Sequence, residues 1–192
     1  MSAAEVASDG GAPSGRAAAA RRVEECRALF ARAAALAARL TPAQLAWTAP
    51  ALGYGGVGAQ LRHVVVFADE LASGARIGRV DYDARARDLA WECDGAAIAR
   101  ALGRAARRLA TLAALDEDAP LAVRQDEPGA RGCARGGFTR SSIGRELRAL
   151  ASHTVHHLAV VELLLHAQGV AGAPSRGLGI APSTPRRGAR AR

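Results

Sequence analysis

The residues best suited to chemistry in this chain are its histidines. Five occur in 192 residues, and three of them stand within the stretch SHTVHH at positions 152–157. His153 and His157 are four residues apart, so on a helix they stand one above the other on the same side. Two imidazoles at this spacing can share one metal ion, as in the helical H-x-x-x-H part of zinc-protease sites. The alternative is that both are hydrogen-bonded histidines that only pack at the edge of a core.

The apolar pattern around this stretch predicts which histidines turn inward. Its apolar face is formed by Ile143, Leu147, Leu150, Val161 and Leu165. On a helix that advances about 100° per residue, His157 falls about 50° and His153 about 90° from the centre of that face. His156 and His166 point well away from it. Glu146 shares the stripe of His153 one heptad earlier, so it either orients that imidazole or is a solvated helix charge.

A metal site needs a third ligand, and His63 is the candidate outside this helix. It lies in QLRHVVVFADEL, at the edge of the apolar face of an earlier helix, about 100° from the centre of that face. Glu70, on the stripe of His63, could orient its ring or simply face solvent. A solitary histidine on a helix is also a common packing residue. The histidines therefore predict either a metal site shared by two helices or separate packing positions.

The elements that must position these side chains are helices. Apolar residues recur at helical spacing over 17–40, 57–75, 94–115 and 139–169. Long connections rich in Gly, Pro and Asp separate them, at 41–56, 76–93 and 116–140. No segment shows strand-like alternation, and Gly169 is the expected stop of the last helix. The pattern predicts an all-α fold, a four-helix bundle with long crossover loops. The predicted domain covers 16–185, with disordered tails at 1–15 and 186–192.

Composition limits the partners and the compartment. All 26 basic residues are Arg, and the formal net charge is +8. The arginines are spread along the chain, with one basic run at 186–192, and the few aromatics are not interleaved with them. Nucleic-acid binding is therefore not expected. Three cysteines without a C-x-x-C pair fit a reducing cytoplasm, and no apolar run is long enough for a membrane span.

The stretch GYGGVG at 53–58 satisfies the G-x-G-x-x-G pattern of dinucleotide-binding sites. That fingerprint requires a strand before it and a helix after it, within a βαβ unit. The preceding residues, AWTAPAL, do not read as a strand. We therefore interpret GYGGVG as a flexible entry into the second helix.

The connection between the second and third helices contains a further candidate, YDARARD. Arg85 and Arg87 carry guanidinium groups suited to bidentate capture of carboxylates, which low-molecular-weight thiols possess. Together with Tyr82 they are candidate substrate-binding residues. The equally weighted alternative is local pairing with Asp83 and Asp88, which would fix a long loop.

These segments resemble the DinB/YfiT-like superfamily of bacterial proteins. The resemblance covers residues 20–185 and rests on GAQLRHVVVFADEL, VDYDARARDLAWE, SSIGRELRALASHTVHHLAVVELLLHAQG and GLGIAPSTP. It implies an up-down-down-up four-helix bundle in which His63, His153 and His157 bind a divalent metal. That family often has polar residues after its first histidine, where this chain has VVVF. The resemblance therefore does not extend to a further ligand or base in that helix.

The resemblance also implies a metal-dependent enzyme, either a transferase or isomerase that uses a thiol such as bacillithiol or mycothiol, or a hydrolase. Three histidine ligands leave a coordination position open, where Zn²⁺, or Ni or Fe in its place, would lower the pKa of a thiol or water. The YDARARD connection and the GIAPSTP tail are expected to form the mouth of the site. A non-catalytic, stress-related metal-binding protein is the alternative. The expected partner is a small-molecule substrate, a homodimer is an open alternative to a monomer, and no membrane is expected.

Overall fold

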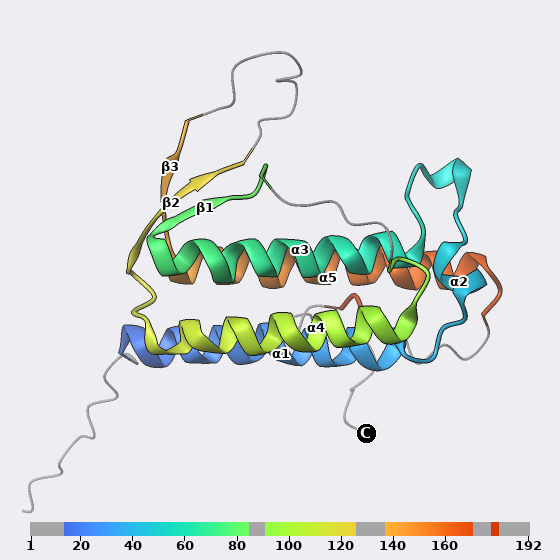
Figure 1. Ribbon diagram of the computed structural model, residues 1–192, viewed down its shortest axis with the longest axis horizontal. Coiled ribbons are helices and arrows are strands. Elements are labelled where there is room, and N and C mark those ends of the chain that lie inside the picture. Colours follow the sequence, from blue (N-terminus) through green and yellow to red (C-terminus); the bar gives the residue numbers. More distant parts are fainter. Residues whose placement is uncertain (1–13, 85–90, 126–136, 171–177, 181–192) are drawn as a thin grey trace, which may run out of the picture.

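Four long helices lie along one axis in the computed structural model (Figure 1). The structure describes residues 14–84, 91–125, 137–170 and 178–180. The helices are α1 (Gly15–Ala37), α3 (Val57–Gly74), α4 (Gly95–Ala110) and α5 (Ile143–Ala167). They confirm the expected all-α, four-helix class. The predicted tail at 186–192 lies outside the described residues. In the predicted tail at 1–15, only Ser14 and Gly15 are described, and they already belong to the start of α1.

The helices run up, down, down and up. Figure 1 shows α1 and α5 running in one direction and α3 and α4 in the other. Each of α1 and α3 packs against both α4 and α5. Because α3 and α4 are parallel neighbours, the chain between them must return along the bundle. At about 1.5 Å per residue, the 16 residues of α4 alone span about 24 Å. The long crossover connection is therefore a geometric necessity.

Local hydrogen bonds set the helix ends. The N-caps of α1, α4 and α5 are Ser14, Asp94 and Ser142, whose side chains accept from first-turn N–H groups. After α5 the backbone turns at Gly169, which has a φ of 72°. The N–H groups of Gly169 and Val170 donate to the carbonyls of His166 and Leu165. This pairing closes the helix as a Schellman motif, so Gly169 is the stop that the sequence predicts.

Aliphatic side chains fill the space between the helices. Fully buried examples are Leu61, Leu71, Leu102, Leu109, Leu147, Leu158 and Leu164. Burial of one such side chain contributes about 1.5–3 kcal/mol. Cys26 of α1 joins this core and its thiol donates to the carbonyl of Leu147. Burial is the main cause that raises the pKa of Cys26 to about 12, so its thiol packs in the protonated form.

Short helical elements occupy parts of the connections. α2 (Pro42–Ala46) begins with a capping box in which Thr41 and Gln44 bond to each other's backbone N–H. The 3₁₀ turn η1 (Pro50–Leu52) follows it. Two further 3₁₀ turns, η2 (Ala75–Ile77) and η3 (Thr111–Ala114), continue α3 and α4. These extensions account for the predicted helix ends near 75 and 115.

Beside the four helices the structure contains a small sheet, which no alternation in the sequence indicated. β1 (Arg79–Asp81), β2 (Pro120–Arg124) and β3 (Thr139–Ser142) form one sheet in that order. β1 pairs in parallel with β2, and β2 pairs antiparallel with β3. The strands have three to five residues, too few for a visible alternation, and their apolar anchors are Val80, Leu121 and Val123. They form because the α3–α4 connection, which contains β1, and the α4–α5 connection, which contains β2 and β3, meet beside the bundle.

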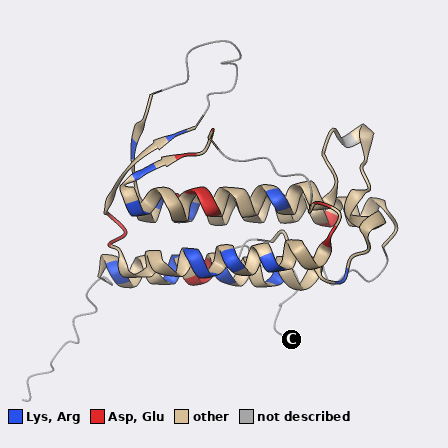
Figure 2. Cartoon of the chain, viewed as in Figure 1, with Lys and Arg blue, Asp and Glu red and all other residues tan. Residues whose placement is uncertain are grey.

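Charge is distributed over several elements. Figure 2 shows arginines on α1, α3, α4 and the sheet, with acidic residues among them. Some are paired, as Arg22 is with Glu117 at 2.9 Å and Arg108 with Asp69 at 2.7 Å. None of the described helices combines the length and apolar character needed to cross a membrane.

Candidate metal centre

The three histidines predicted as ligands come together between α3 and α5. His63 lies on α3, and His153 and His157 lie on successive turns of α5. The ring centroid of His63 is 5.0 Å from that of His153 and 4.6 Å from that of His157, and the α5 pair is 4.4 Å apart. One ligand nitrogen from each residue lies within 4.8 Å of the others. The chain therefore contains a three-histidine cluster that could hold a metal ion.

The remaining two histidines of α5 lie outside this cluster. His156 and His166 are exposed, whereas His153 and His157 are half-buried. The His156 ring contacts His157 edge-on, at 5.2 Å between centroids. Helical rotation alone therefore separated the inward His153 and His157 from the outward His156 within SHTVHH.

The cluster fits a divalent metal. In a tetrahedral site with Zn–N bonds of about 2.0–2.1 Å, ligand nitrogens lie about 3.4 Å apart. Nitrogens that already lie within 4.8 Å need only small ring movements to reach that separation. Metal binding also requires neutral imidazoles. Burial, and next the neighbouring His153, His63 and His156, lower the pKa of His157 to about 3, so this ring is neutral at physiological pH.

A glutamine that the sequence analysis missed contacts His157. Nδ1 of His157 lies 2.6 Å from Oε1 of Gln60, which stands on α3 about one turn before His63. The Gln60 residue is 9% exposed. The available signal was a polar amide on the apolar side of that helix, three residues before the histidine. Buried amides of this kind are normally hydrogen-bonded, which makes Gln60 a natural partner for a ligand ring.

Phe67 and Tyr82 close one side of the cluster. The ring of Phe67, one turn after His63, lies 4.2 Å from the ring of His153 and 5.0 Å from that of His63. Tyr82 stacks on Phe67 with 4.6 Å between centroids and an angle of 17°. Tyr82 follows β1 and donates its backbone N–H to the carbonyl of Arg124 in β2. The small sheet therefore places the Tyr82 ring, which forms an aromatic wall with Phe67.

Glu146 and Tyr82 form a buried hydrogen-bonded pair. The Tyr82 hydroxyl donates to one carboxylate oxygen of Glu146 at 3.0 Å, and Ser141 donates to the other. Burial, then the Glu146 carboxylate and then the charge of Glu70, raise the pKa of Tyr82, so its hydroxyl remains a donor. Glu146 was a candidate to orient an imidazole. Its carboxylate instead meets two hydroxyls, and it is linked to the histidines through Tyr82 and Phe67.

We expect the substitution Tyr82→Phe to lower the free energy of unfolding by about 1–3 kcal/mol, because a buried carboxylate oxygen loses its donor. Urea unfolding followed by circular dichroism measures this change. Tyr54→Phe is the matched control. Tyr54 is 41% exposed, so its substitution should stay within about 0.5 kcal/mol of the parent. Equal effects of the two substitutions would contradict the role given to the Tyr82–Glu146 hydrogen bond.

The end of the connection that leads into α4 is fastened to α3 beside the cluster. Arg62, next to His63, forms a half-buried ion pair with Glu92. One turn earlier, Gly58 lies directly against the main chain of Glu92. A Cβ at Gly58 would stand 1.8 Å from the Glu92 carbonyl oxygen, so only glycine permits this approach.

The structure describes only the beginning of the YDARARD stretch, as far as residue 84. Arg85, Arg87 and Asp88 lie outside the described residues. Tyr82 is 3% exposed, with its ring in the aromatic wall. The substrate-binding role assigned to Tyr82, Arg85 and Arg87 thus stays a prediction.

The described part of the C-terminal tail docks on α5. Leu178 is buried, and the Gly179 N–H donates to Glu162 at 3.4 Å. Gly179 also lies so close to Ala159 that a Cβ would stand 2.3 Å from the Ala159 Cα. By rotation around the helix, Ala159 and Glu162 lie about 200° and 140° from His157. This contact is therefore on a different side of α5 from the histidine cluster, and 181–185 lie outside the described residues.

The GYGGVG stretch serves as a turn and a helix entry. Gly53 has a φ of 67° and ends η1, Tyr54 forms an isolated bridge with Ala49, and Gly56 is the N-cap of α3. The element before it is a 3₁₀ turn. The interpretation as an entry into the second helix is confirmed, and no strand precedes the glycines in the described part of the chain.

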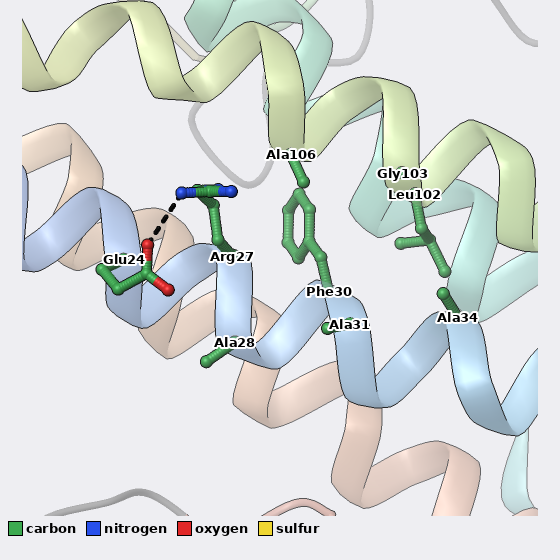
Figure 3. Close-up of a pocket in the computed structure, with 9 residues that line it drawn as sticks. All are labelled: Glu24, Arg27, Ala28, Phe30, Ala31, Ala34, Leu102, Gly103 and Ala106. Atoms are coloured by element: carbon green, nitrogen blue, oxygen red, sulfur yellow. Dashed lines mark hydrogen bonds and ion pairs between the residues drawn. The ribbon is translucent and has the colours of Figure 1, made fainter.

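A pocket lies between α1 and α4, the two helices that carry none of the clustered histidines. Figure 3 shows Phe30 of α1 and Leu102 and Ala106 of α4 lining it, beside the ion pair of Glu24 with Arg27. Its volume is about 230 Å³. Because its walls are mainly aliphatic and aromatic, it lacks the group of convergent ligand atoms that the histidine cluster provides.

Comparison with known proteins agrees with this geometry. The family model of the DinB superfamily matches residues 8–161. This range runs from α1 into α5 and contains all three clustered histidines. No curated protein and no solved structure matches the chain. The match covers most of the chain and agrees with the up-down-down-up bundle and the three-histidine cluster. The chain therefore belongs to the DinB superfamily.

Proposed function

We propose that this protein is a divalent-metal-dependent enzyme in which His63, His153 and His157 hold the metal. The observation that carries the proposal is the convergence of three ligand nitrogens within 4.8 Å, from two helices far apart in the sequence. Three imidazoles suit Zn²⁺ best, with Ni or Fe as alternatives. The proposed reaction is a transfer or isomerisation that consumes a low-molecular-weight thiol, and the proposed partner is therefore a small molecule.

The chain's own residues have distinct tasks in this proposal. A three-histidine divalent metal, when bound, supplies the Lewis acidity that makes a thiol or a water molecule nucleophilic near neutral pH. The burial that keeps His157 neutral also keeps it available as a ligand. Phe67 and Tyr82 exclude water from one side of the cluster, which strengthens electrostatic interactions there. Arg85 and Arg87 would hold the carboxylates of the thiol.

The test is a metal analysis followed by an activity screen on protein purified without a histidine tag. We expect close to one divalent metal per chain, and metal-dependent consumption of an electrophile in the presence of bacillithiol, mycothiol or glutathione. Removal of the metal with a chelator should abolish the reaction, and readdition should restore it. Metal binding without turnover of any thiol would instead identify a non-catalytic metal-binding protein. Absence of bound metal would mean that the histidines only pack.

The substitutions Arg85→Ala and Arg87→Ala test the thiol-binding part of the proposal. Each should raise the KM for the thiol by about 10-fold or more, as expected for loss of a charge-assisted hydrogen bond worth about 1.5–3 kcal/mol. Metal content should not change. Arg107→Ala on the exposed face of α4 is the matched control and should leave both quantities unchanged. Full thiol-dependent activity in both loop variants would show that these arginines do not bind the substrate.

A further inference from the structure

Gln60 makes two hydrogen bonds that define the orientation of its amide. Its Nε2 donates to the carbonyl oxygen of Gly55 at 3.5 Å, and its Oε1 lies 2.6 Å from Nδ1 of His157. A flipped amide would place Oε1 against the Gly55 carbonyl, which is also an acceptor. The arrangement therefore presents an acceptor, and not a donor, to the imidazole.

An acceptor at this position selects one form of the ring. Neutral imidazole carries its proton on either Nδ1 or Nε2, and the hydrogen bond made by one nitrogen decides the state of the other. With Oε1 of Gln60 facing Nδ1, the proton belongs on Nδ1. Nε2 then has a free lone pair, which is what a metal ligand requires.

We propose that Gln60 is a positioning residue that holds His157 in its Nδ1-protonated tautomer, with Nε2 as the ligand atom. The metal part of this inference rests on the proposed function, whereas the tautomer is a property of the protein without metal. Gln60 suits the task because it is buried and belongs to α3, the helix that also carries His63. One turn of α3 thus supplies both a ligand and the group that orients a ligand of α5.

The tautomer is measured directly in the metal-free full-length protein. Long-range proton–nitrogen NMR spectra of histidine-labelled protein distinguish a protonated ring nitrogen from a bare one. We expect His157 to show a protonated Nδ1 and a bare Nε2. A proton on Nε2 of His157 would overturn the inference whether or not the protein binds metal.

Metal affinity provides the second readout. Gln60→Leu removes the acceptor and should weaken Zn²⁺ binding by about 10–100-fold, the usual effect of losing a group that orients a ligand. Gln60→Glu keeps an acceptor at the same place, so it should retain both the tautomer and tight binding. Gln168→Leu is the matched control. It removes another half-buried glutamine, whose amide donates to the Gln44 carbonyl away from the histidines.

The outcomes separate the two claims. If the parent protein binds no metal but shows the expected tautomer, the proposed function and the ligand role of Nε2 fail, whereas the selection of the tautomer by Gln60 stands. If Gln60→Leu is folded by circular dichroism and binds Zn²⁺ as tightly as the parent, the positioning role is wrong. Equal weakening in Gln168→Leu and Gln60→Leu would also overturn it, because the loss would then reflect general destabilisation.

Discussion

Alanine in place of His153 or His157 is expected to remove most of the bound metal, and His63→Ala should do the same. Each substitution deletes one of three imidazoles whose nitrogens lie within 4.8 Å. Loss of a ligand should weaken affinity by more than the roughly 10–100-fold that accompanies loss of an orienting group. Metal content of the purified variants, measured by mass spectrometry, and titration with a competing chelator give the stoichiometry and the affinity.

His156→Ala is the matched control because it stands in the same helical stretch. His156 is exposed and lies outside the cluster. This variant should keep the parent's metal content, as should His166→Ala. Equal loss of metal in His156→Ala and His157→Ala would mean that α5 is rotated differently from the structure. Full retention in every variant would exclude the cluster as the metal site.

The second large effect is expected from Phe67→Ala. Phe67 is 7% exposed and contacts the rings of His63, His153 and Tyr82. Truncation of a buried phenylalanine costs about 3–5 kcal/mol, because apolar burial is lost and a cavity remains. Urea unfolding of the metal-free protein measures this change. Metal affinity should fall as well, since two of the three ligand rings lose the surface against which they pack.

Phe67→Leu provides the comparison. It keeps most of the apolar contact and should cost less than about 1.5 kcal/mol. If Phe67→Ala destabilises by no more than Phe67→Leu, the aromatic wall is not tightly packed. If both variants lose stability but keep full metal affinity, the wall supports the bundle without holding the histidine rings.

The sequence by itself determined the features that depend on neighbours along the chain. Helical spacing of apolar residues predicted four helices, and the turn after Gly169 followed from the conformational freedom of glycine. The inward direction of His153 and His157, and the outward direction of His156, also follow from rotation around one helix. These properties need no knowledge of how the helices pack. The resemblance carried by HVVVFADEL and SHTVHH then indicated the family and the direction of the helices.

Only the tertiary structure decided which residues meet across the bundle. Gln60 meets His157 although they are 97 residues apart, and Tyr82 meets Glu146 across 64 residues. No local sequence pattern predicts either contact. Each contact depends on how far two elements are shifted relative to each other along the bundle axis. The sheet is the clearest case, since β1 is three residues long and its partner β2 begins about 40 residues later. Its stability comes from burial of Val80 and Leu121 beside the bundle, which no window of the sequence can display.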